Sequence, residues 1–138
     1  MSLTRVSPQD ARDLMDKDGY AYVDVRSIPE FEAGHPEGAY NIPLLHMGPQ
    51  GMSPNPDFLD VVQRTFAKDA KLVIGCKAGG RSLRAATLLI ASGFTNVVDQ
   101  RAGFEGAPGE PGWRPSGMPV STQTTAGRGY ETLRAKPR

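Results

Sequence analysis

Apolar positions along the chain follow two periods, and the change from one to the other marks the predicted elements. Short apolar runs at 20–25, 39–42, 72–74 and 95–98 have the length and the flanking turn residues of buried strands. Apolar residues at three- and four-residue spacing between these runs predict helices. Strands that alternate with helices predict a small α/β fold, with a mainly parallel central sheet flanked by helices on both faces.

Three segments carry the helical period. The first follows Ser7-Pro8, a capping residue and a proline suited to the first turn. The second follows Asn55-Pro56, which repeats this signal, and the third spans residues 81–92. In the third segment the predicted inward face consists of Leu83, Ala86, Leu89 and Ile90.

Glycine and proline divide the rest of the chain. Residues 47–56 are predicted to form a loop, and in the stretch 102–119 Trp113 is the expected anchor on the core. The length of 138 residues suits one domain, which we place at residues 1–120. Residues 121–138 are predicted to form a polar, basic tail that is either mobile or docked on the surface.

The overall composition narrows the class of protein. An apolar fraction of 38% and a charged fraction of 22% are typical of a globular protein. A formal net charge of +1 gives no field that would attract nucleic acid or a membrane, so neither is an expected partner. The sequence shows no apolar segment of membrane-spanning length and no signal peptide, and its single cysteine forbids an internal disulfide. These features predict a cytoplasmic protein.

The only cysteine, Cys76, is the strongest candidate for chemistry. It follows the predicted strand at 72–74 and opens a loop that leads into the third helix: Lys77, Ala78, Gly79, Gly80, Arg81 and Ser82. Glycines permit the positive φ angles with which successive backbone N–H groups converge on one point. The helix N-terminus and the cations Lys77 and Arg81 add positive charge. Such a loop would stabilise a thiolate, a persulfide anion or a small oxyanion, whereas an inert buried cysteine is the alternative.

Three segments, taken together, resemble one protein family. The loop from Cys76 to Ser82 resembles the active-site loop of the single-domain rhodaneses, C-x-x-G-x-R-S. The segment from Asp24 to Pro43 is similar to the N-terminal signature of that family, with Asp24-Val25-Arg26, Glu30-Phe31, Gly34 to Ala39 and Asn41-Ile42-Pro43 in order, and with Pro36 in place of the usual aliphatic residue. The segment from Gly103 to Val120 resembles the closing part, although Phe104 replaces the second glycine and the stretch before Trp113 is longer.

The resemblance implies a rhodanese-like domain with sulfurtransferase activity. In that family the cysteine takes the outer sulfur of a donor such as thiosulfate, holds it as a persulfide and passes it to a thiophilic acceptor. Cys76 would be the nucleophile, the amides of residues 77–82 would hold the persulfide, and Lys77 and Arg81 would bind the anionic donor and stabilise the leaving sulfite. This covalent chemistry requires no metal and no organic cofactor. The expected partners are thiosulfate or a persulfide as donor, and a thiol, a cyanide-like molecule or a sulfur-relay protein as acceptor.

Two other functions remain open at this point. Phosphatases and arsenate reductases of the related Cys–Arg loop type rely on the same electrostatics but place five residues between the two side chains. Four residues separate Cys76 from Arg81, a loop size that suits a single sulfur atom. A non-catalytic rhodanese-like binding module is the second alternative, and the presence of Cys76 and Arg81 disfavours it.

Other matched positions are expected to support the site. Asp24, Arg26 and Glu30 would hold the first loop through an ion pair and hydrogen bonds. His35 lies in a turn and is expected to be structural, because a preformed thiolate needs no general base. With one cysteine and two histidines, the chain is also a poor candidate for a structural zinc site.

Overall fold

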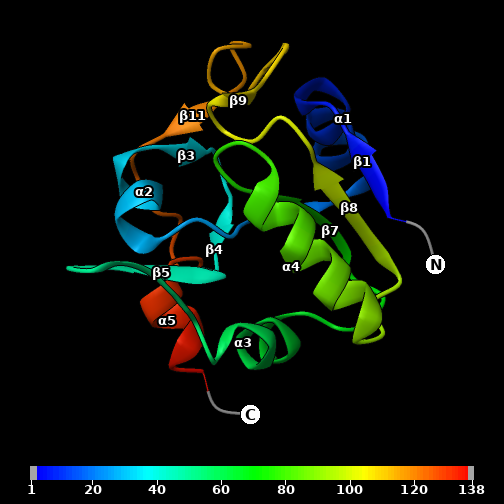
Figure 1. Cartoon of the computed structure of the whole chain (residues 1–138). Coiled ribbons are helices and arrows are strands. Elements are labelled where there is room, and N and C mark those ends of the chain that lie inside the picture. Colours follow the sequence, from blue (N-terminus) through cyan, green and yellow to red (C-terminus); the bar gives the residue numbers. More distant parts are fainter. Residues whose placement is uncertain (1–2, 137–138) are drawn as a thin grey trace.

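The computed structural model describes residues 3–136 and has a five-stranded sheet at its centre, in the order β1-β8-β7-β2-β4. All neighbouring strands of this sheet are parallel. The strands are β1 (Thr4–Val6), β2 (Ala21–Asp24), β4 (Tyr40–Asn41), β7 (Lys71–Gly75) and β8 (Asn96–Gln100). The helices are α1 (Pro8–Asp18), α2 (Ile28–Ala33), α3 (Phe58–Thr65), α4 (Gly80–Ala91) and α5 (Tyr130–Arg134). The predicted α/β class with a parallel sheet is confirmed (Figure 1).

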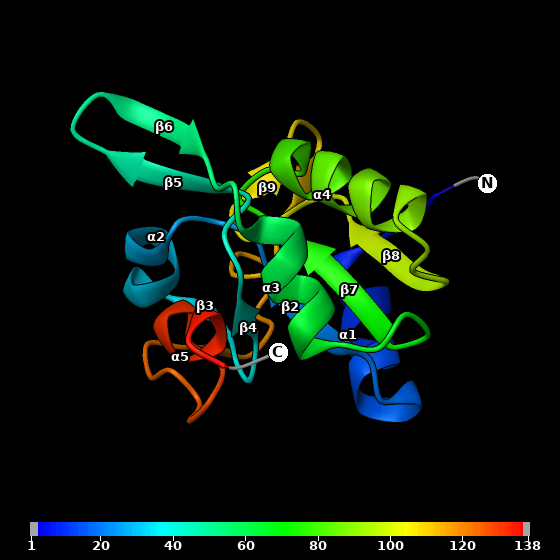
Figure 2. The same cartoon turned by 90° about the horizontal axis from the view of Figure 1, so that it is seen from below.

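The two faces of the sheet carry separate cores, because successive side chains of a strand point to opposite faces. On β7, Leu72 and Ile74 pack into one cluster with α3 and α4, whereas Val73 packs into the other with Ala11 of α1 and with Trp113. Figure 2 shows α3 and α4 on one side of the sheet and α1 on the other. The predicted flanking of both faces is therefore confirmed.

The start of α1 follows the predicted capping pattern. The Ser7 hydroxyl accepts a hydrogen bond from the Asp10 N–H at 3.1 Å, and Pro8 occupies the first helical turn. Gly19 ends the helix with a φ of 72°, a left-handed conformation that glycine adopts without a steric penalty.

The prediction of a loop at residues 47–56 was wrong over most of its length. An antiparallel hairpin, β5 (Leu45–Gly48) with β6 (Gly51–Pro54), occupies this region and extends away from the body of the molecule (Figure 2). Its strands are largely exposed on both faces, so they lack the apolar alternation by which a half-buried strand is recognised. Met47 and Met52 face each other across the hairpin and are 49% and 42% exposed.

The inward face of α4 also differs from the prediction. Leu83, expected to face the core, is exposed, and the buried side chains are Ser82, Ala85, Ala86 and Leu89. Small residues let a helix approach a sheet closely, so the alanines rather than the larger Leu83 take the contact positions. The resulting rotation of α4 turns Ser82 inward, toward the start of the loop that follows β7.

The C-terminal third closes the fold with short elements and one large anchor. The Trp113 side chain is buried, and its indole N–H donates to the Pro119 carbonyl at 2.7 Å, as the anchor prediction required. The short strands here are β9 (Gly106–Ala107), which pairs with β10 (Glu110–Pro111), and β11 (Val120–Ser121), which pairs with β3 (His35–Pro36).

The division of the chain at residue 120 stays a prediction. Within residues 121–136, Tyr130 and Leu133 are buried in the same cluster as α3 and α4, and Figure 1 shows α5 beside α3.

Among the helices of residues 3–136, none is long and apolar enough to cross a membrane.

Candidate active site

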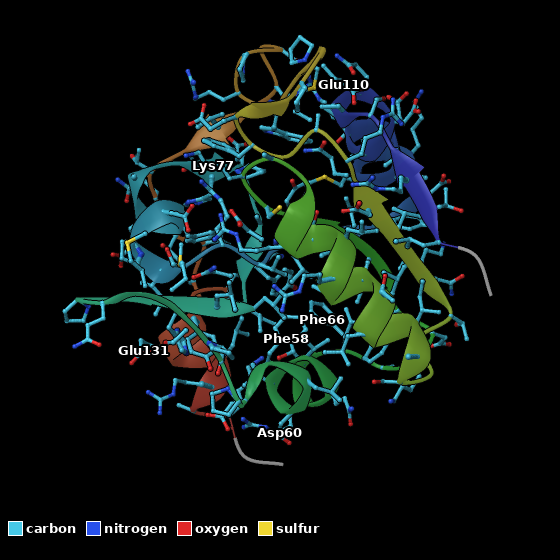
Figure 3. The ribbon with its side chains drawn as sticks, in the orientation of Figure 1. Phe58, Asp60, Phe66, Lys77, Glu110 and Glu131 are labelled. Carbon is cyan, nitrogen blue, oxygen red and sulfur yellow. The ribbon has the colours of Figure 1, made fainter. Side chains whose placement is uncertain are left out.

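Cys76 lies directly after the carboxyl end of β7, in the loop that opens α4. The carboxyl ends of parallel strands are the usual position of binding sites in open α/β sheets. The residue is 2% exposed, and its carbonyl accepts a hydrogen bond from the Phe104 N–H at 2.7 Å. Figure 3 labels Lys77, the next residue, beside this loop at the start of α4.

Two polar groups of the loop converge on the Cys76 sulfur. The Gly79 N–H donates to Sγ at 3.1 Å, and the Ser82 hydroxyl lies 3.5 Å from Sγ. The amides of Gly80, Arg81 and Ser82 belong to the first turn of α4, where backbone N–H groups have no partner within the helix. The Gly79 N–H is the amide that donates to the sulfur among residues 3–136, and the sulfur lies at the N-terminus of α4, whereas the roles of the other loop amides stay a prediction.

Only one of the two loop glycines is required by its conformation. Gly79 has a φ of 101°, and a Cβ at this position would lie 2.2 Å from the Arg101 carbonyl oxygen. A side chain is therefore excluded there both by conformation and by contact with the backbone. Gly80 has no positive φ and has open space around its Cα, so its role is limited to the backbone amide at the helix start.

Arg81 is held in place by Glu30 of α2. Its Nη1 and Nη2 donate to the two carboxylate oxygens of Glu30 at 2.7 and 3.0 Å, and the two side chains are 16% and 17% exposed. Although burial opposes ionisation of Glu30, hydrogen bonds from Arg81 and Ser27 lower its pKa to about 2. Its hydrogen bonds to Glu30 raise the pKa of Arg81, although burial opposes this shift, and Coulombic interactions with Glu30 and Asp24 add to it. Sequence reasoning placed Glu30 in the first loop and Arg81 in the second, and the structure joins them.

Asp24 and Arg26 form a second, more deeply buried ion pair. The guanidinium of Arg26 donates to Asp24 Oδ2 at 2.7 Å and to the Gly34 carbonyl at 2.7 Å, and it stacks over the Phe104 ring at 4.3 Å. The Asn41 amide donates to the carbonyls of Asp24 and Arg26 at 3.1 and 3.0 Å. Together these contacts hold the first loop against the segment that follows β8.

A further ion pair lies behind the loop and was not anticipated from the sequence. Arg5 of β1 donates to the buried Asp99 carboxylate of β8 at 2.6 Å, and it also contacts the Gly79 carbonyl at 3.4 Å. Burial raises the pKa of Asp99, while the Ser82 hydroxyl and Arg5 oppose this shift. Arg5 thereby links the edge strand of the sheet to the loop around Cys76.

A pocket of about 360 Å³ opens beside the loop. Its lining includes three cations from separate segments, Arg26, Lys77 and Arg114, together with Glu30, Ala33, Gly34, Phe104, Glu105 and Val120. Arg114 and Glu105 form an exposed ion pair, whereas within residues 3–136 the Lys77 ammonium has no hydrogen-bond or ion-pair partner. The unusually long stretch before Trp113 is the one sequence feature that pointed to this wall of the pocket.

The structure brings some of the predicted site residues to the sulfur and places others further away. Cys76, Gly79 and Ser82 come together at the sulfur, and Lys77 lies at the pocket. Arg81 instead forms the bidentate pair with Glu30, between α2 and the segment from Cys76 to Ser82, which we call the sulfur loop. The assignment of catalytic and donor-binding roles to these residues stays a prediction.

The fold and the site define an α/β domain with a cysteine in the loop before a helix and an arginine in the first turn of that helix. Comparison with known families agrees, because the model of the rhodanese-like domain matches residues 7–107. The chain belongs to the rhodanese-like domain family, as the sequence motifs predicted.

Individual relatives show the same affiliation. Thiosulfate sulfurtransferase 16 of Arabidopsis thaliana, a chloroplastic protein, is 41% identical over 102 residues, which cover 74% of this chain and 80% of the relative. Thiosulfate sulfurtransferase 18 of the same plant is 35% identical, with 76% and 74% of the two chains covered. The senescence-associated protein DIN1 of Raphanus sativus is 43% identical, and the match spans about half of its length, 55%.

Solved structures show the same fold. The crystal structure of Rv0390 from M. tuberculosis superposes with a TM-score of 0.75 at 25% identity, and the match covers 89% of this chain and all of the other, 100%. The chain is thus related to proteins named thiosulfate sulfurtransferases. The relatives include chloroplastic proteins, so the predicted cytoplasmic location is not supported by them.

Proposed function

We propose that this protein is a sulfurtransferase in which Cys76 takes sulfane sulfur from thiosulfate or a related persulfide donor and passes it to a thiophilic acceptor. The convergence of the Gly79 N–H and the Ser82 hydroxyl on Sγ, at the N-terminus of α4, is the observation that carries the proposal. Relatives named thiosulfate sulfurtransferase, at 41% and 35% identity, support it.

The proposed reaction has two halves. The Cys76 thiolate attacks the outer sulfur of thiosulfate, the bond between the two sulfurs of the donor breaks, and sulfite leaves with the bonding electron pair. The persulfide anion then occupies the loop, where amides of residues 77–82 stabilise its charge. A nucleophilic acceptor attacks the outer sulfur in the second half, and the Cys76 thiolate is regenerated.

Each charged residue has a distinct proposed role. Lys77, which has no ion-pair partner within residues 3–136, binds the anionic donor. Arg81, oriented by Glu30, supplies positive charge for the persulfide and for the leaving sulfite. Ala78 and Gly80 contribute backbone amides, and Asp24, Arg26 and Glu30 keep the surrounding loops in place. The reaction requires no metal or cofactor, and we place it in the cytoplasm.

The test is intact-protein mass spectrometry after incubation with thiosulfate, before and after cyanide is added. The unaltered protein should gain one sulfur atom on Cys76 and lose it to cyanide. Cys76→Ser should abolish the gain and all turnover while the circular dichroism spectrum and the melting temperature stay unchanged, because the side chains are nearly isosteric. An unmodified but alkylatable Cys76 in the unaltered protein would contradict the proposal and direct attention to phosphatase and arsenate reductase assays.

A further inference from the structure

We propose that the pocket lined by Lys77, the residue after Cys76, receives an acceptor thiol that carries a carboxylate, and that Arg114 leaves Glu105 to bind this carboxylate. Arg114 then determines acceptor specificity in the second half of the sulfur-transfer reaction. This inference rests on the proposed function, because it assigns a substrate class to the same site.

The size of the pocket indicates an organic ligand. Thiosulfate consists of two sulfur and three oxygen atoms, so it is small beside the pocket of about 360 Å³. Pockets of this volume are typical of small organic molecules.

The walls of the pocket differ in chemistry. Phe104 and Val120 form an apolar wall that suits the methylene groups of an organic thiol. Lys77 lies next to Cys76 in the chain, and Arg114 comes from the segment after β10. Arg26, Glu30 and Glu105 also line the pocket, but Asp24 holds Arg26, and Arg81 holds Glu30. A ligand with its sulfur toward Cys76 and an anion at its other end therefore has Lys77 and, once Glu105 is displaced, Arg114 as its cationic partners.

Arg114 is the cation that can change partner. Its side chain is 55% exposed and that of Glu105 is 39% exposed, so solvent screens the pair and little energy opposes its separation. Nε and Nη2 of Arg114 both donate to one oxygen of Glu105, Oε1, whereas a ligand carboxylate would offer the guanidinium two oxygens in a planar, bidentate geometry. Arg26 and Arg81 cannot exchange in this way, because buried or half-buried carboxylates hold them.

Backbone contacts place these groups near one another. The Glu105 N–H donates to the Lys77 carbonyl at 3.0 Å, and the Arg114 N–H donates to the Phe104 carbonyl at 3.0 Å. Lys77, Glu105 and Arg114 therefore lie on three adjoining stretches of chain along one border of the pocket. Figure 3 labels Lys77 beside the loop that opens α4, and Glu131 on α5, elsewhere on the molecule.

The chemical step is balanced without another reagent. The acceptor thiol releases its proton to solvent, and its thiolate attacks the outer sulfur of the Cys76 persulfide. A bond forms between the acceptor sulfur and the outer sulfur, the bond to Cys76 Sγ breaks, and its electron pair returns to Cys76 as the thiolate. Arg114 holds the acceptor carboxylate during this transfer and takes no part in the bond changes.

The experiment compares two acceptors of nearly equal size, mercaptopropionate and mercaptopropanol. The persulfide is first formed with thiosulfate, and single-turnover loss of the sulfur is then followed by mass spectrometry, with rates expressed per acceptor thiolate. A charge-assisted hydrogen bond at a partly exposed site should give mercaptopropionate an advantage of about tenfold. Arg114→Gln should reduce this advantage to about twofold or less and leave the mercaptopropanol rate unchanged.

Two further variants sharpen the result. Glu105→Gln should increase the advantage by about threefold, because it frees Arg114 and removes a competing anion. Arg134→Gln is the matched control, since Arg134 is 53% exposed and also pairs with a glutamate, Glu131. It should change neither rate.

The outcomes separate the inference from the proposed function. Equal rates for the two acceptors in the unaltered protein, or an advantage that survives Arg114→Gln, would overturn the carboxylate assignment while sulfur transfer itself stands. An equal loss of both rates in Arg114→Gln would show a structural role and would also overturn it. Failure of thiosulfate to load Cys76 in the unaltered protein would overturn the proposed function, and the inference with it.

Discussion

Two arginine–glutamate pairs contact the same pocket, one through Glu30 alone and the other through both Arg114 and Glu105, and they differ in how firmly they are held. Arg81 and Glu30 make two hydrogen bonds and are 16% and 17% exposed, whereas Arg114 and Glu105 are 55% and 39% exposed. Exposed pairs contribute little to stability because solvent screens them, and separation of a buried pair leaves an uncompensated charge. The first pair is therefore a permanent part of the site, and the second is available to a ligand.

The largest effect is expected from a substitution that removes the firmly held pair, Arg81→Ala. Arg81→Ala leaves the Glu30 carboxylate half-buried without its partner, so the free energy of unfolding should fall by about 1–2 kcal/mol, between the values for exposed and buried pairs. Loss of the positive charge beside the persulfide should slow loading from thiosulfate by about tenfold or more. Denaturant unfolding and single-turnover mass spectrometry measure the two effects, with Arg134→Ala as the control. An unchanged loading rate would show that Arg81 does not stabilise the reacting sulfur.

Lowering the pH tests how firmly the first pair is held, because it protonates Glu30. Its pKa of about 2 in the folded protein lies below the ordinary value of 4.5, so the folded state keeps the carboxylate ionised where the unfolded chain takes up a proton. The stabilisation is complete above pH 4.5 and is lost as the pH falls from 4.5 toward 2.

Glu30→Gln should remove this contribution. The difference in unfolding free energy between the unaltered protein and the variant should be constant above pH 4.5 and shrink below it. Urea unfolding at a series of pH values measures it. A difference that stays constant down to pH 2 would show that Glu30 is not the titrating group.

The smallest effect is expected at the exposed pair. Arg114→Gln should leave the melting temperature unchanged within error, because the Arg114 side chain loses only a solvent-screened partner. Thermal unfolding at low and high salt provides the measurement. The difference in melting temperature between the variant and the unaltered protein should be within error at both salt concentrations. A clear loss of stability in the variant would mean that Arg114 supports the fold and is not free to change partner.

The parts of the molecule that sequence reasoning predicted well depend on short, contiguous patterns. The strand before Cys76 is an unbroken apolar run, and all residues of the sulfur loop follow one another from Cys76 to Ser82. The loop could therefore be predicted before any tertiary contact was known. The family signature extended this prediction to the whole α/β fold.

The parts that were missed depend on contacts between distant positions or on exposed structure. Glu30 and Arg81 are 51 positions apart, and Arg5 and Asp99 are 94 apart, so no local pattern reports either pair. The hairpin β5–β6 buries little apolar surface, so its sequence shows no strand pattern. Its glycine and proline residues were therefore the only signal, and they predicted a loop. Leu83 was misplaced because spacing alone does not show that smaller alanines occupy the contact with the sheet.

The position of α5 has a consequence for how the chain is made. Tyr130 and Leu133 complete the core on the α3 and α4 face, and the Tyr130 hydroxyl accepts a hydrogen bond from Asn55 at 3.0 Å. Chains emerge from the ribosome N-terminus first, so the sulfur loop and its helix leave the exit tunnel well before these two residues. During that interval the face of the sheet that α3 and α4 cover lacks part of its apolar cover, which is supplied only by residues near the end of the chain, Tyr130 and Leu133.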